Sequence, residues 1–301
     1  MAAGIDVSTL KYTADIITES GARFALDNAL LNMDWEEQQG DLAQRANFTV
    51  RNAAVNNTWI HALAKLNCVI RIRSSWNGGS NVSVFDGNIW DWRYVSETQK
   101  ELSLTAYDPL IRLQQSQDFK YYSAGLRTQD LLGDICADWG IPLSYEWSQQ
   151  LTHAKKVFNG KFVGDMITGI LEEVRQQTGE KYVVNYSDGQ LRVKGYGTND
   201  TVYLFGRDSA MSTSNRFSMN NLVTRVKVLG KQDDDGRAPV EAVLDGDTSF
   251  GVLQAIVRRD GTKTLEAAMN EADAVLATRG KPVETTQINV PDVPTIRGGG
   301  V

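Results

Sequence analysis

The stretch of sequence that most constrains the fold runs from residue 82 to residue 107. Its first half places aromatic residues at every second position, namely at Trp90, Trp92 and Tyr94. This two-residue period is that of a β-strand, in which successive side chains point to opposite faces. The second half, from Leu102 to Tyr107, alternates in the same way after a polar connection at residues 96–100. We therefore expect a long antiparallel ribbon with its aromatic residues along one side.

The sequence before this ribbon predicts further strands and one short helix. Strand-like runs occupy residues 11–19, 24–26, 30–37, 46–50 and 68–73. The helix is predicted for residues 59–66, with Thr58 or Asn57 as its N-cap. Five or more short antiparallel strands with one helix indicate a small β-barrel or sandwich. We expect this part to end at Asp108 and Pro109.

The middle of the chain has a helical pattern. Thr128 is expected to cap a helix that ends before Gly140, and a second helix is expected at about residues 161–178, before Gly179. Apolar side chains recur along one stripe of each helix, as they do in helices that pack on a sheet. The partner is expected to be a hairpin of residues 181–186 and 190–194, whose Asp188-Gly189 connection favours a type I′ turn. These elements predict a compact α/β domain.

After residue 200 the pattern returns to β-strands. Residues 202–205, 222–229, 240–244 and 287–290 are strand candidates. A third helix is predicted for residues 265–278, with Thr264 as its N-cap. Its predicted buried face comprises Leu265, Ala268, Met269, Ala272, Val275 and Leu276. Because the order of strands and one helix is similar to that of the first part, we expect a second β-rich domain.

Composition excludes several classes of protein. The 301 residues are 42% hydrophobic and 23% charged, as in an ordinary globular protein, and their number predicts two or three domains. A formal net charge of -6 argues against a general nucleic-acid-binding surface, which needs clustered Lys and Arg. No apolar stretch is long enough for a membrane span and no signal-peptide pattern is present, so we expect cytoplasmic folding. Cys68 and Cys136 are expected to be reduced and buried.

Residues that could hold a metal or act as nucleophiles are scarce. The two histidines, His61 and His153, stand apart from each other and from both cysteines, which disfavours a metal site or a catalytic triad. Residues 233–235 form an acidic run, but positions one and twelve of a calcium loop would be Lys231 and Ala242. We therefore expect no cofactor and no nucleophilic catalysis.

Paired carboxylates leave one enzymatic alternative open. Asp86 with Asp91, or Glu172 with Glu173, could supply the acid and base of a glycosidase that cuts cell wall. Such an enzyme needs its two carboxylates roughly 5 to 9 Å apart, and no pattern in the sequence brings these pairs together. The tryptophans could form a sugar-binding platform, although such residues more often fill cores and interfaces.

Several motifs carry a resemblance to a known family. They are Val84-Phe-Asp-Gly-Asn-Ile89, Leu104-Thr-Ala-Tyr-Asp-Pro-Leu110, Tyr122-Ser-Ala-Gly-Leu-Arg-Thr128, Asp134-Ile-Cys-Ala-Asp-Trp-Gly-Ile-Pro142, Asn221-Leu-Val-Thr-Arg-Val-Lys-Val228 and Asp247-Thr-Ser-Phe-Gly-Val252. With them the chain resembles the XkdQ/YqbQ-like family, the baseplate hub proteins of contractile phage tails and phage-tail-like particles. The similarity covers nearly the whole chain and rests on the number and order of the motifs.

The resemblance implies an α+β, mainly β fold with two tube-like antiparallel β-barrel domains and an α/β insertion between them. On this expectation the first barrel spans residues 1–108, the insertion 109–200 and the second barrel, with one helix, 201–301. The family continues with further strands beyond the segment that matches residues 292–297, so the second barrel is expected to be incomplete at residue 301.

The implied function is that of a non-enzymatic homotrimer whose six barrels adapt a sixfold tail tube to a threefold spike. Its implied partners are the tail tube protein or a tube initiator, the spike protein, the wedge proteins and, as a further candidate, the tape-measure protein. No membrane and no specific nucleic acid is among them. The implied location is the tail baseplate of a virion, with assembly in the host cytoplasm.

Two loops are the candidates for exposed docking sites. They comprise Trp76, Asn77, Gly78, Gly79 and Ser80 in the first, and Asp233, Asp234 and Asp235 in the second. Two rival functions stay open. One is a cell-wall hydrolase or peptidoglycan-binding tail module, and the other is a tail tube or adaptor protein.

Overall fold

The computed structural model describes residues 7–38, 40–55, 57–79, 81–95, 100–198, 211–259, 264–290, 293–294 and 296–299. The chain divides into two compact units, the first formed by Met1–Leu204 with Asp292–Val301 and the second by Phe205–Pro291. The described residues of the first unit form two hydrophobic cores and those of the second unit form one. The expected domain boundaries after residues 108 and 200 stay a prediction.

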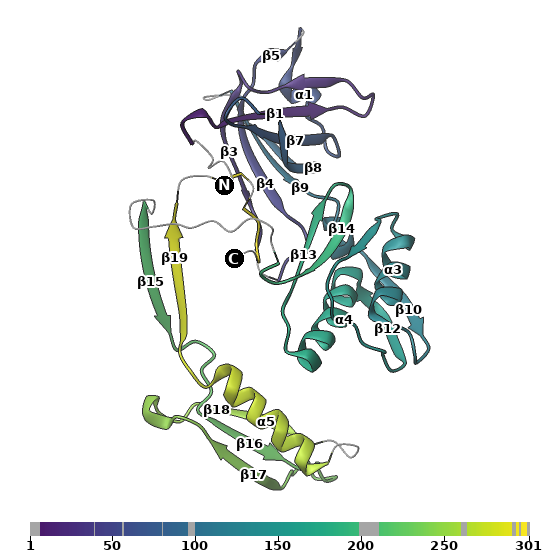
Figure 1. The fold of residues 1–301 in the computed structure, drawn as a ribbon, viewed down its shortest axis with the longest axis vertical. Coiled ribbons are helices and arrows are strands. Elements are labelled where there is room, and N and C mark those ends of the chain that lie inside the picture. Colours follow the sequence, from purple (N-terminus) through teal and green to yellow (C-terminus); the bar gives the residue numbers. More distant parts are fainter. Residues whose placement is uncertain are drawn as a thin grey trace. The chain divides into compact units, whose positions relative to one another are not determined.

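One core of the first unit lies against a seven-stranded antiparallel sheet (Figure 1). Its strands are β1 (Lys11–Ile17), β2 (Arg23–Ala25), β3 (Leu30–Glu36), β4 (Arg45–Arg51), β7 (Val69–Ser75), β8 (Val82–Val95) and β9 (Glu101–Tyr107), in the order β2-β1-β7-β8-β9-β4-β3. Strands β4, β7 and β9 bury every second residue, as their sequence periods predict. Short elements accompany the sheet: η1 (Val7–Thr9), β5 (Ala54–Val55), β6 (Thr58–Trp59) and α1 (Ile60–Leu63).

This sheet is open. Within the described residues its two outer strands, β2 and β3, each pair on one side only. The mainly β fold expected from the sequence is confirmed, but the sheet does not close into a barrel in this part of the chain. Closure would require β2 to pair with β3, and β2 offers only three residues for such a ladder.

The predicted ribbon is the pair β8 and β9, and it contains a β-bulge. The pairing shifts directly after Ile89, so Trp90 is the extra residue. Because of this shift, the side chain of Trp92 lies on the same face of the sheet as that of Ile89, and Trp92 pairs with the buried Leu104. Trp90 is 45% exposed. Trp92 and Tyr94 therefore pack against the core without Trp90. The expectation of three aromatic residues along one side is wrong, because a bulge reverses the alternation.

The helix predicted for residues 59–66 is shorter than expected. Helix α1 spans Ile60–Leu63, and its N-cap is Trp59, which makes no side-chain cap bond. Thr58 is instead paired in the two-residue strand β6 with β5. A left-handed backbone at Asn67 (φ 66°) then leads into β7. Asn57 and Thr58 are thus wrong as N-caps, because Asn57 forms the turn before β6 with a left-handed backbone (φ 64°) and Thr58 is paired in that strand.

The other core of the first unit belongs to the middle of the chain. Its elements are α2 (Ile111–Gln115), β10 (Gln117–Tyr122), α3 (Thr128–Asp138), β11 (Leu143–Tyr145), β12 (Lys156–Phe162), α4 (Val163–Thr178), β13 (Tyr182–Ser187) and β14 (Gln190–Gly195). Strand β10 pairs with β12, while β11, β14 and β13 form a second small sheet in which β11 is parallel to β14. Helices α3 and α4 bury their predicted apolar stripes in this core. The α/β character of the middle part is confirmed.

The turn chemistry of this part agrees with the sequence, with one exception. Gly179 ends α4 in the left-handed conformation (φ 75°), and Asp188 and Gly189 both have positive φ, as a type I′ turn requires. The exception is Thr128, which is not the N-cap of α3. Arg127 holds that position, and the Thr128 hydroxyl lies 2.9 Å from Nε2 of His153.

The second unit consists of a two-stranded ribbon and a three-stranded sheet covered by one helix (Figure 1). Its elements are β15 (Ser212–Ser218), β16 (Arg225–Leu229), β17 (Val240–Asp245), η2 (Thr248–Phe250), β18 (Gln254–Arg258), α5 (Leu265–Arg279) and β19 (Val283–Asn289). Strand β15 pairs with β19, and the sheet has the order β17-β16-β18. The described residues form no closed barrel here either. The strand candidate at residues 202–205 lies outside the described residues.

Helix α5 begins where the sequence predicts but buries a narrower face. The Thr264 hydroxyl accepts a hydrogen bond from the N–H of Ala267 at 3.1 Å, so the predicted N-cap is confirmed. Ala268 and Ala272 are fully buried against the sheet. Leu265 and Met269, expected on the same face, are 42% and 38% exposed. A sheet of three short strands is too narrow to cover the whole predicted stripe.

Candidate interaction surfaces

The first loop predicted as a docking site is an exposed, well-defined turn. Asn77 has a left-handed backbone (φ 51°), and the N–H of Gly79 donates to the carbonyl oxygen of Trp76 at 2.8 Å. The hydroxyl of Thr9 accepts a hydrogen bond from the N–H of Asn77 at 2.8 Å. Trp76 itself is half-buried, and Ser80 lies outside the described residues. The tip that could meet a partner is therefore centred on Asn77, Gly78 and Gly79.

The second predicted loop connects β16 to β17 in the other unit. Asp233 serves the turn itself, because its carboxylate accepts the N–H of Arg237 at 2.6 Å and its carbonyl oxygen accepts the N–H of Gly236. Asp234 and Asp235 are exposed. Of the three aspartates, these two are available to a partner. The docking role of both loops stays a prediction.

Asp108 joins the seven-stranded sheet to the middle part of the chain. Its carboxylate oxygens accept the N–H of Gln44, at 2.9 Å, and the N–H of Leu110, at 2.8 Å. Its own N–H donates to the carbonyl oxygen of Gln44 at 3.1 Å. Burial raises the pKa of Asp108 to about 7, although both backbone hydrogen bonds oppose this shift. One buried carboxyl group therefore fixes the end of β9, the start of β4 and the start of α2.

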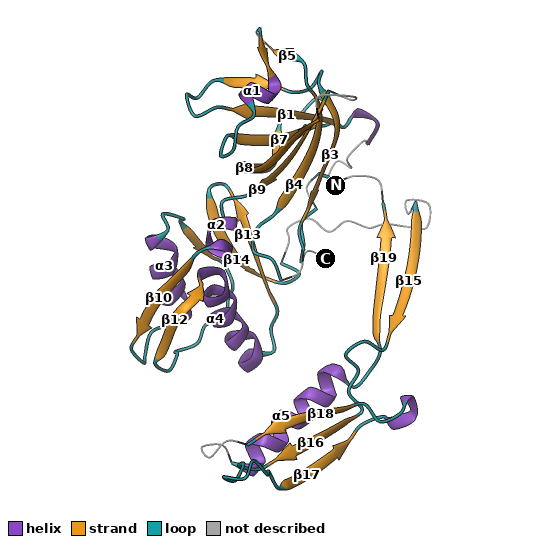
Figure 2. Cartoon of the chain, turned by 180° about the vertical axis from the view of Figure 1, so that it is seen from behind, coloured by secondary structure: helices purple, strands orange, loops and turns teal. Residues whose placement is uncertain are grey.

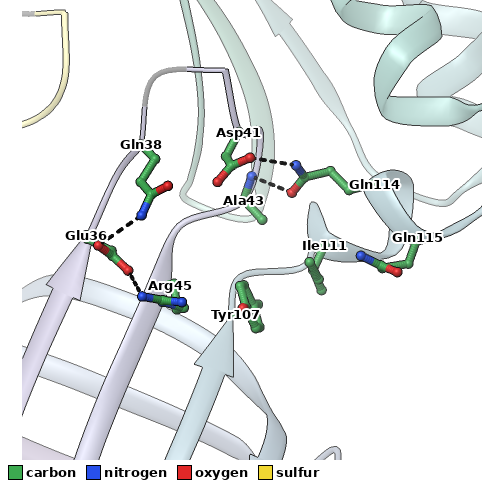
Figure 3. Close-up of a pocket in the computed structure, with 9 residues that line it drawn as sticks. All are labelled: Glu36, Gln38, Asp41, Ala43, Arg45, Tyr107, Ile111, Gln114 and Gln115. Carbon is green, nitrogen blue, oxygen red and sulfur yellow. Dashed lines mark hydrogen bonds and ion pairs between the residues drawn. The ribbon is translucent and has the colours of Figure 1, made fainter.

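A small cavity of about 200 Å³ opens beside this junction (Figure 3). On one wall Glu36 forms an ion pair with Arg45 and accepts a hydrogen bond from Gln38 at 3.2 Å. On the other wall Gln114 accepts the N–H of Ala43 at 3.1 Å. Most of the polar groups that line the cavity are thus engaged with each other. This arrangement stabilises the seam between the β3–β4 connection and α2.

A larger groove of about 810 Å³ lies on the same side of the first unit. Its walls come from the β3–β4 connection, the middle of α4, strand β13 and the C-terminal residues Gly298 and Gly299. Among the described residues strand β13 pairs with β14 alone, so it is an edge strand in this part of the chain. The groove is therefore lined on one side by an unpaired strand edge, which is the kind of surface that polypeptide segments recognise.

The C-terminal residues bind to this groove through backbone contacts. The N–H of Gly298 donates to Glu37 at 2.7 Å, and the carbonyl oxygen of Gly299 accepts the N–H of Gly197 at 2.8 Å. Arg297 donates to the carbonyl oxygen of Val84 at 3.1 Å. Gly299 has a φ of 76°, and a Cβ atom there would lie 2.0 Å from a methyl carbon of Val183. Only glycine fits this position. Through its hydrogen bonds to Val84 and Gly197, the segment connects the seven-stranded sheet to the residues that follow the β13–β14 hairpin.

The groups that could have supported catalysis are engaged in structural contacts. His153 is buried between the Thr128 hydroxyl and Glu173, whose carboxylate lies 3.3 Å from Nδ1 and also pairs with Lys156. Burial lowers the pKa of His153, and Glu173 partly opposes this. Glu172, the other member of that carboxylate pair, accepts a hydrogen bond from Arg175 at 2.7 Å.

Asp86, from the other suggested carboxylate pair, is also engaged. Asp86 forms an ion pair with Arg71 and accepts a hydrogen bond from Ser83. Cys68 and Cys136 are buried free thiols, and burial raises the pKa of Cys136 to about 12. Among the described residues no three His, Cys, Asp or Glu side chains come together as metal ligands would. No described helix is both long and apolar enough to cross a membrane.

Sequence reasoning identified the two loops but not the groove or the docked C-terminal residues. The groove depends on residues from six separate segments, so no local sequence pattern predicts it. The sequence nevertheless contains one feature that could have predicted the docking of these residues. Three consecutive glycines at residues 298–300 allow close approach of backbone to backbone, which is one of the uses of glycine.

Comparison with known proteins places this fold among phage tail proteins. A tail protein from Neisseria meningitidis is 16% identical and superposes with a TM-score of 0.63 over 93% of this chain and 80% of its own. The tail protein of prophage MuSo2 from Shewanella oneidensis is 11% identical and superposes with a TM-score of 0.64, over 94% and 82% of the two chains. At these identities the likeness concerns the fold.

The sequence comparisons agree with the resemblance inferred from the motifs. The chain is 24% identical over 203 residues to the uncharacterized protein YqbQ of Bacillus subtilis. That match covers 66% of this chain and 61% of the relative, so the chain spans less than two thirds of the relative's length. A profile described as YQBQ-like matches residues 33–301. The protein therefore belongs to the YQBQ-like family.

Proposed function

We propose that this protein is a structural component of a phage tail or phage-tail-like particle, and that it serves there as the baseplate hub. In this role three copies form a ring that joins a sixfold tail tube to a threefold spike. The observation that carries the proposal is the likeness in fold to two phage tail proteins over more than nine tenths of the chain, in a member of the YQBQ-like family.

The open sheet supports a role in an assembly. Strand β3 has seven residues, pairs on one side only within the described part of the chain, and leaves Leu31 46% exposed. Unpaired strand edges of this length promote pairing with other chains, and stable monomers usually cover or shorten them. A closed ring of identical copies covers such edges without leading to open-ended polymers.

The chemistry of the described residues also favours a structural role over the rival cell-wall hydrolase. Glu172, Glu173 and Asp86 are each paired with a basic side chain, and a general acid needs a carboxyl group with a raised pKa. Ion pairing lowers the pKa of Glu172 and Glu173 instead. We expect the purified protein to cause no turnover of cell walls in a muralytic assay.

The proposed role is tested by deleting the gene in its native genome and imaging the particles by electron microscopy. We expect particles without complete tails, and recovery of tails when the gene is supplied again. A tagged copy should appear at the tail tip, at three copies for each tail by quantitative mass spectrometry. Intact tails that lack the protein would overturn the proposal, and six copies would favour a tail tube or adaptor protein.

The proposed partners follow from the position at the tail tip. They are the tube protein or a tube initiator, the spike protein, the wedge proteins and the tape-measure protein, with assembly in the host cytoplasm. Cross-linking of purified particles followed by mass spectrometry tests them. We expect the cross-links to include residues of the loops centred on Asn77 and Asp234.

A further inference from the structure

One face of the three-stranded sheet in the second unit is left uncovered by the described residues of that unit. Helix α5 packs on the other face, against Val226 and Val228 of β16. The uncovered face carries Lys227 on the central strand, with Val243 directly opposite on β17 and Ile256 directly opposite on β18. Val243 and Ile256 are 48% and 51% exposed. Figure 2 shows these three strands side by side. An apolar sheet face of this kind is normally covered by a second layer.

The ribbon of β15 and β19 lacks a core of its own. Thirteen of the fourteen residues in its two strands are exposed, and none of them belongs to the hydrophobic core of the unit. One of its faces, called here the apolar ribbon face, carries one apolar side chain at each end: Ile288 lies opposite Thr213, and Phe217 lies opposite Glu284. Phe217 is 69% exposed. A two-stranded ribbon in water is marginally stable at best, so this one needs a surface to pack against.

The two uncovered surfaces have complementary charges. On the sheet face, Arg225 is neutralised by Asp245, with a hydrogen bond of 2.9 Å, whereas Lys227 has no ion-pair partner among the described residues. On the apolar ribbon face, Glu284 likewise has no ion-pair partner within the described part of the chain. Each surface thus offers exposed apolar side chains beside charges that lack an ion-pair partner among the described residues: Lys227 and Arg258 on the sheet face, and Glu284 on the ribbon face. The charges on the two surfaces are opposite in sign. Placing them in contact pairs the charges and buries the apolar groups together.

We propose that the β15–β19 ribbon of one copy packs on the uncovered β17-β16-β18 face of the next copy, with Glu284 beside Lys227. This contact rests on the proposed function, because it requires several copies in one assembly. It joins two different surfaces head to tail, and such a contact closes into a ring when the rotation between copies allows it. The loop with Asp234 and Asp235 connects β16 to β17 and would lie at the edge of this contact.

The contact is tested by disulfide cross-linking between two differently tagged chains, one carrying Phe217→Cys and the other Val243→Cys. Phe217 lies directly opposite Glu284 on the ribbon, and Val243 lies directly opposite Lys227 on the sheet, so the proposed pairing of Glu284 with Lys227 brings these two positions together. We expect a disulfide between the two chains on mild oxidation. The matched control replaces Ser218, which lies on the opposite ribbon face, with Cys, and should give at most a tenth of that yield. Equal yields from both pairs, or no disulfide between chains, would overturn the proposed contact.

Charge reversal provides a second test on the full chain. Lys227→Glu and Glu284→Lys should each lower the cross-linking yield at least tenfold, and the double variant should restore it, because the pair is then reformed with exchanged charges. Lys231→Glu, in the exposed loop after β16, is the control and should leave the yield unchanged. Failure of the double variant to restore the yield would contradict the pairing. If tails contain three copies of the cysteine variants but no disulfide between them, the proposed contact is wrong and the proposed function stands. If the disulfide forms but the protein is absent from tails, the proposed function is wrong.

Discussion

At the scale of single residues, Asp108 shows how one buried carboxyl group connects elements distant in the sequence. It is 2% exposed, and its two backbone hydrogen bonds reach Gln44 and Leu110. The sequence marked Asp108 and Pro109 as the end of the first part, and the structure shows why the chain changes character there. The carboxylate satisfies backbone donors at the start of both neighbouring elements, which would otherwise be buried without partners.

Asp108 should make stability depend on pH. Its folded pKa, about 7, is raised from its ordinary value of 3.8, so its stabilising contribution is complete below pH 3.8 and is lost as the pH rises through 7. We expect the free energy of unfolding to fall by up to about 1.4 kcal/mol per pH unit in this window. Asp108→Asn should remove this dependence, in urea unfolding between pH 4 and pH 8. Asp234→Asn is the control, and equal slopes in the wild type and Asp108→Asn would contradict the prediction.

Gly299 is the residue on which docking of the C-terminal segment should depend. In Gly299→Ala the new methyl group meets Val183 and the backbone is strained at positive φ, so the segment should be released at a cost of more than about 1 kcal/mol. Hydrogen exchange of the Gly197 amide, which donates to Gly299, should then become about tenfold faster.

Gly133→Ala in α3 provides the contrast. A Cβ atom at Gly133 meets no neighbour, and the residue lies inside a helix, so this change should stabilise the protein by about 1 kcal/mol and leave the Gly197 amide unaffected. If the Gly197 amide exchanges at the same rate in Gly299→Ala and Gly133→Ala, docking of the C-terminal segment does not depend on Gly299.

At the scale of elements, helix α4 followed its local signals more closely than strand β8 did. Helix α4 covers nearly the predicted range and ends at the predicted glycine. Strand β8 has the predicted extent, but its bulge at Trp90 changed which aromatic side chains reach the core. A helix closes its hydrogen bonds within itself, whereas the register of a strand is set by its partner, here β9.

Helix α5 should depend strongly on its N-cap. Its buried contacts are small, because Ala268 and Ala272 are the fully buried residues of the helix. Thr264→Ala removes the hydrogen bond to the N–H of Ala267 and should destabilise the second unit by about 1 kcal/mol in urea unfolding. Thr264→Ser keeps a hydroxyl acceptor and should retain most of that stability. An equal loss in both variants would mean that the cap bond contributes nothing.

At the scale of the whole molecule, the second unit is inserted into the first. The chain leaves the first unit after Leu204 and returns to it from Asp292 onward. The described residues of the first unit form two cores, and those of the second unit form one, whose buried cluster has six residues. A unit with so small a core depends on further packing for its stability.

The two units should therefore unfold in separate transitions in differential scanning calorimetry. Leu171→Ala removes a fully buried side chain from the first unit and should destabilise its transition by about 2–5 kcal/mol. Val228→Ala should lower only the other transition, by about 1–3 kcal/mol, because Val228 belongs to the core of the second unit. If either substitution shifts both transitions equally, the units fold as one.

The sequence by itself determined the mainly β character, the α/β middle part, the hairpin at Asp188 and Gly189, the cap at Thr264 and the family. These features depend on residues near one another in the chain, where period, turn and cap preferences act directly. Only the tertiary structure decided that the large sheet stays open, that Trp90 leaves the core, that Asp108 is buried and that Gly299 docks beside Val183. Each of these depends on contacts between segments far apart in sequence, and local patterns carry no information about which distant surfaces will meet.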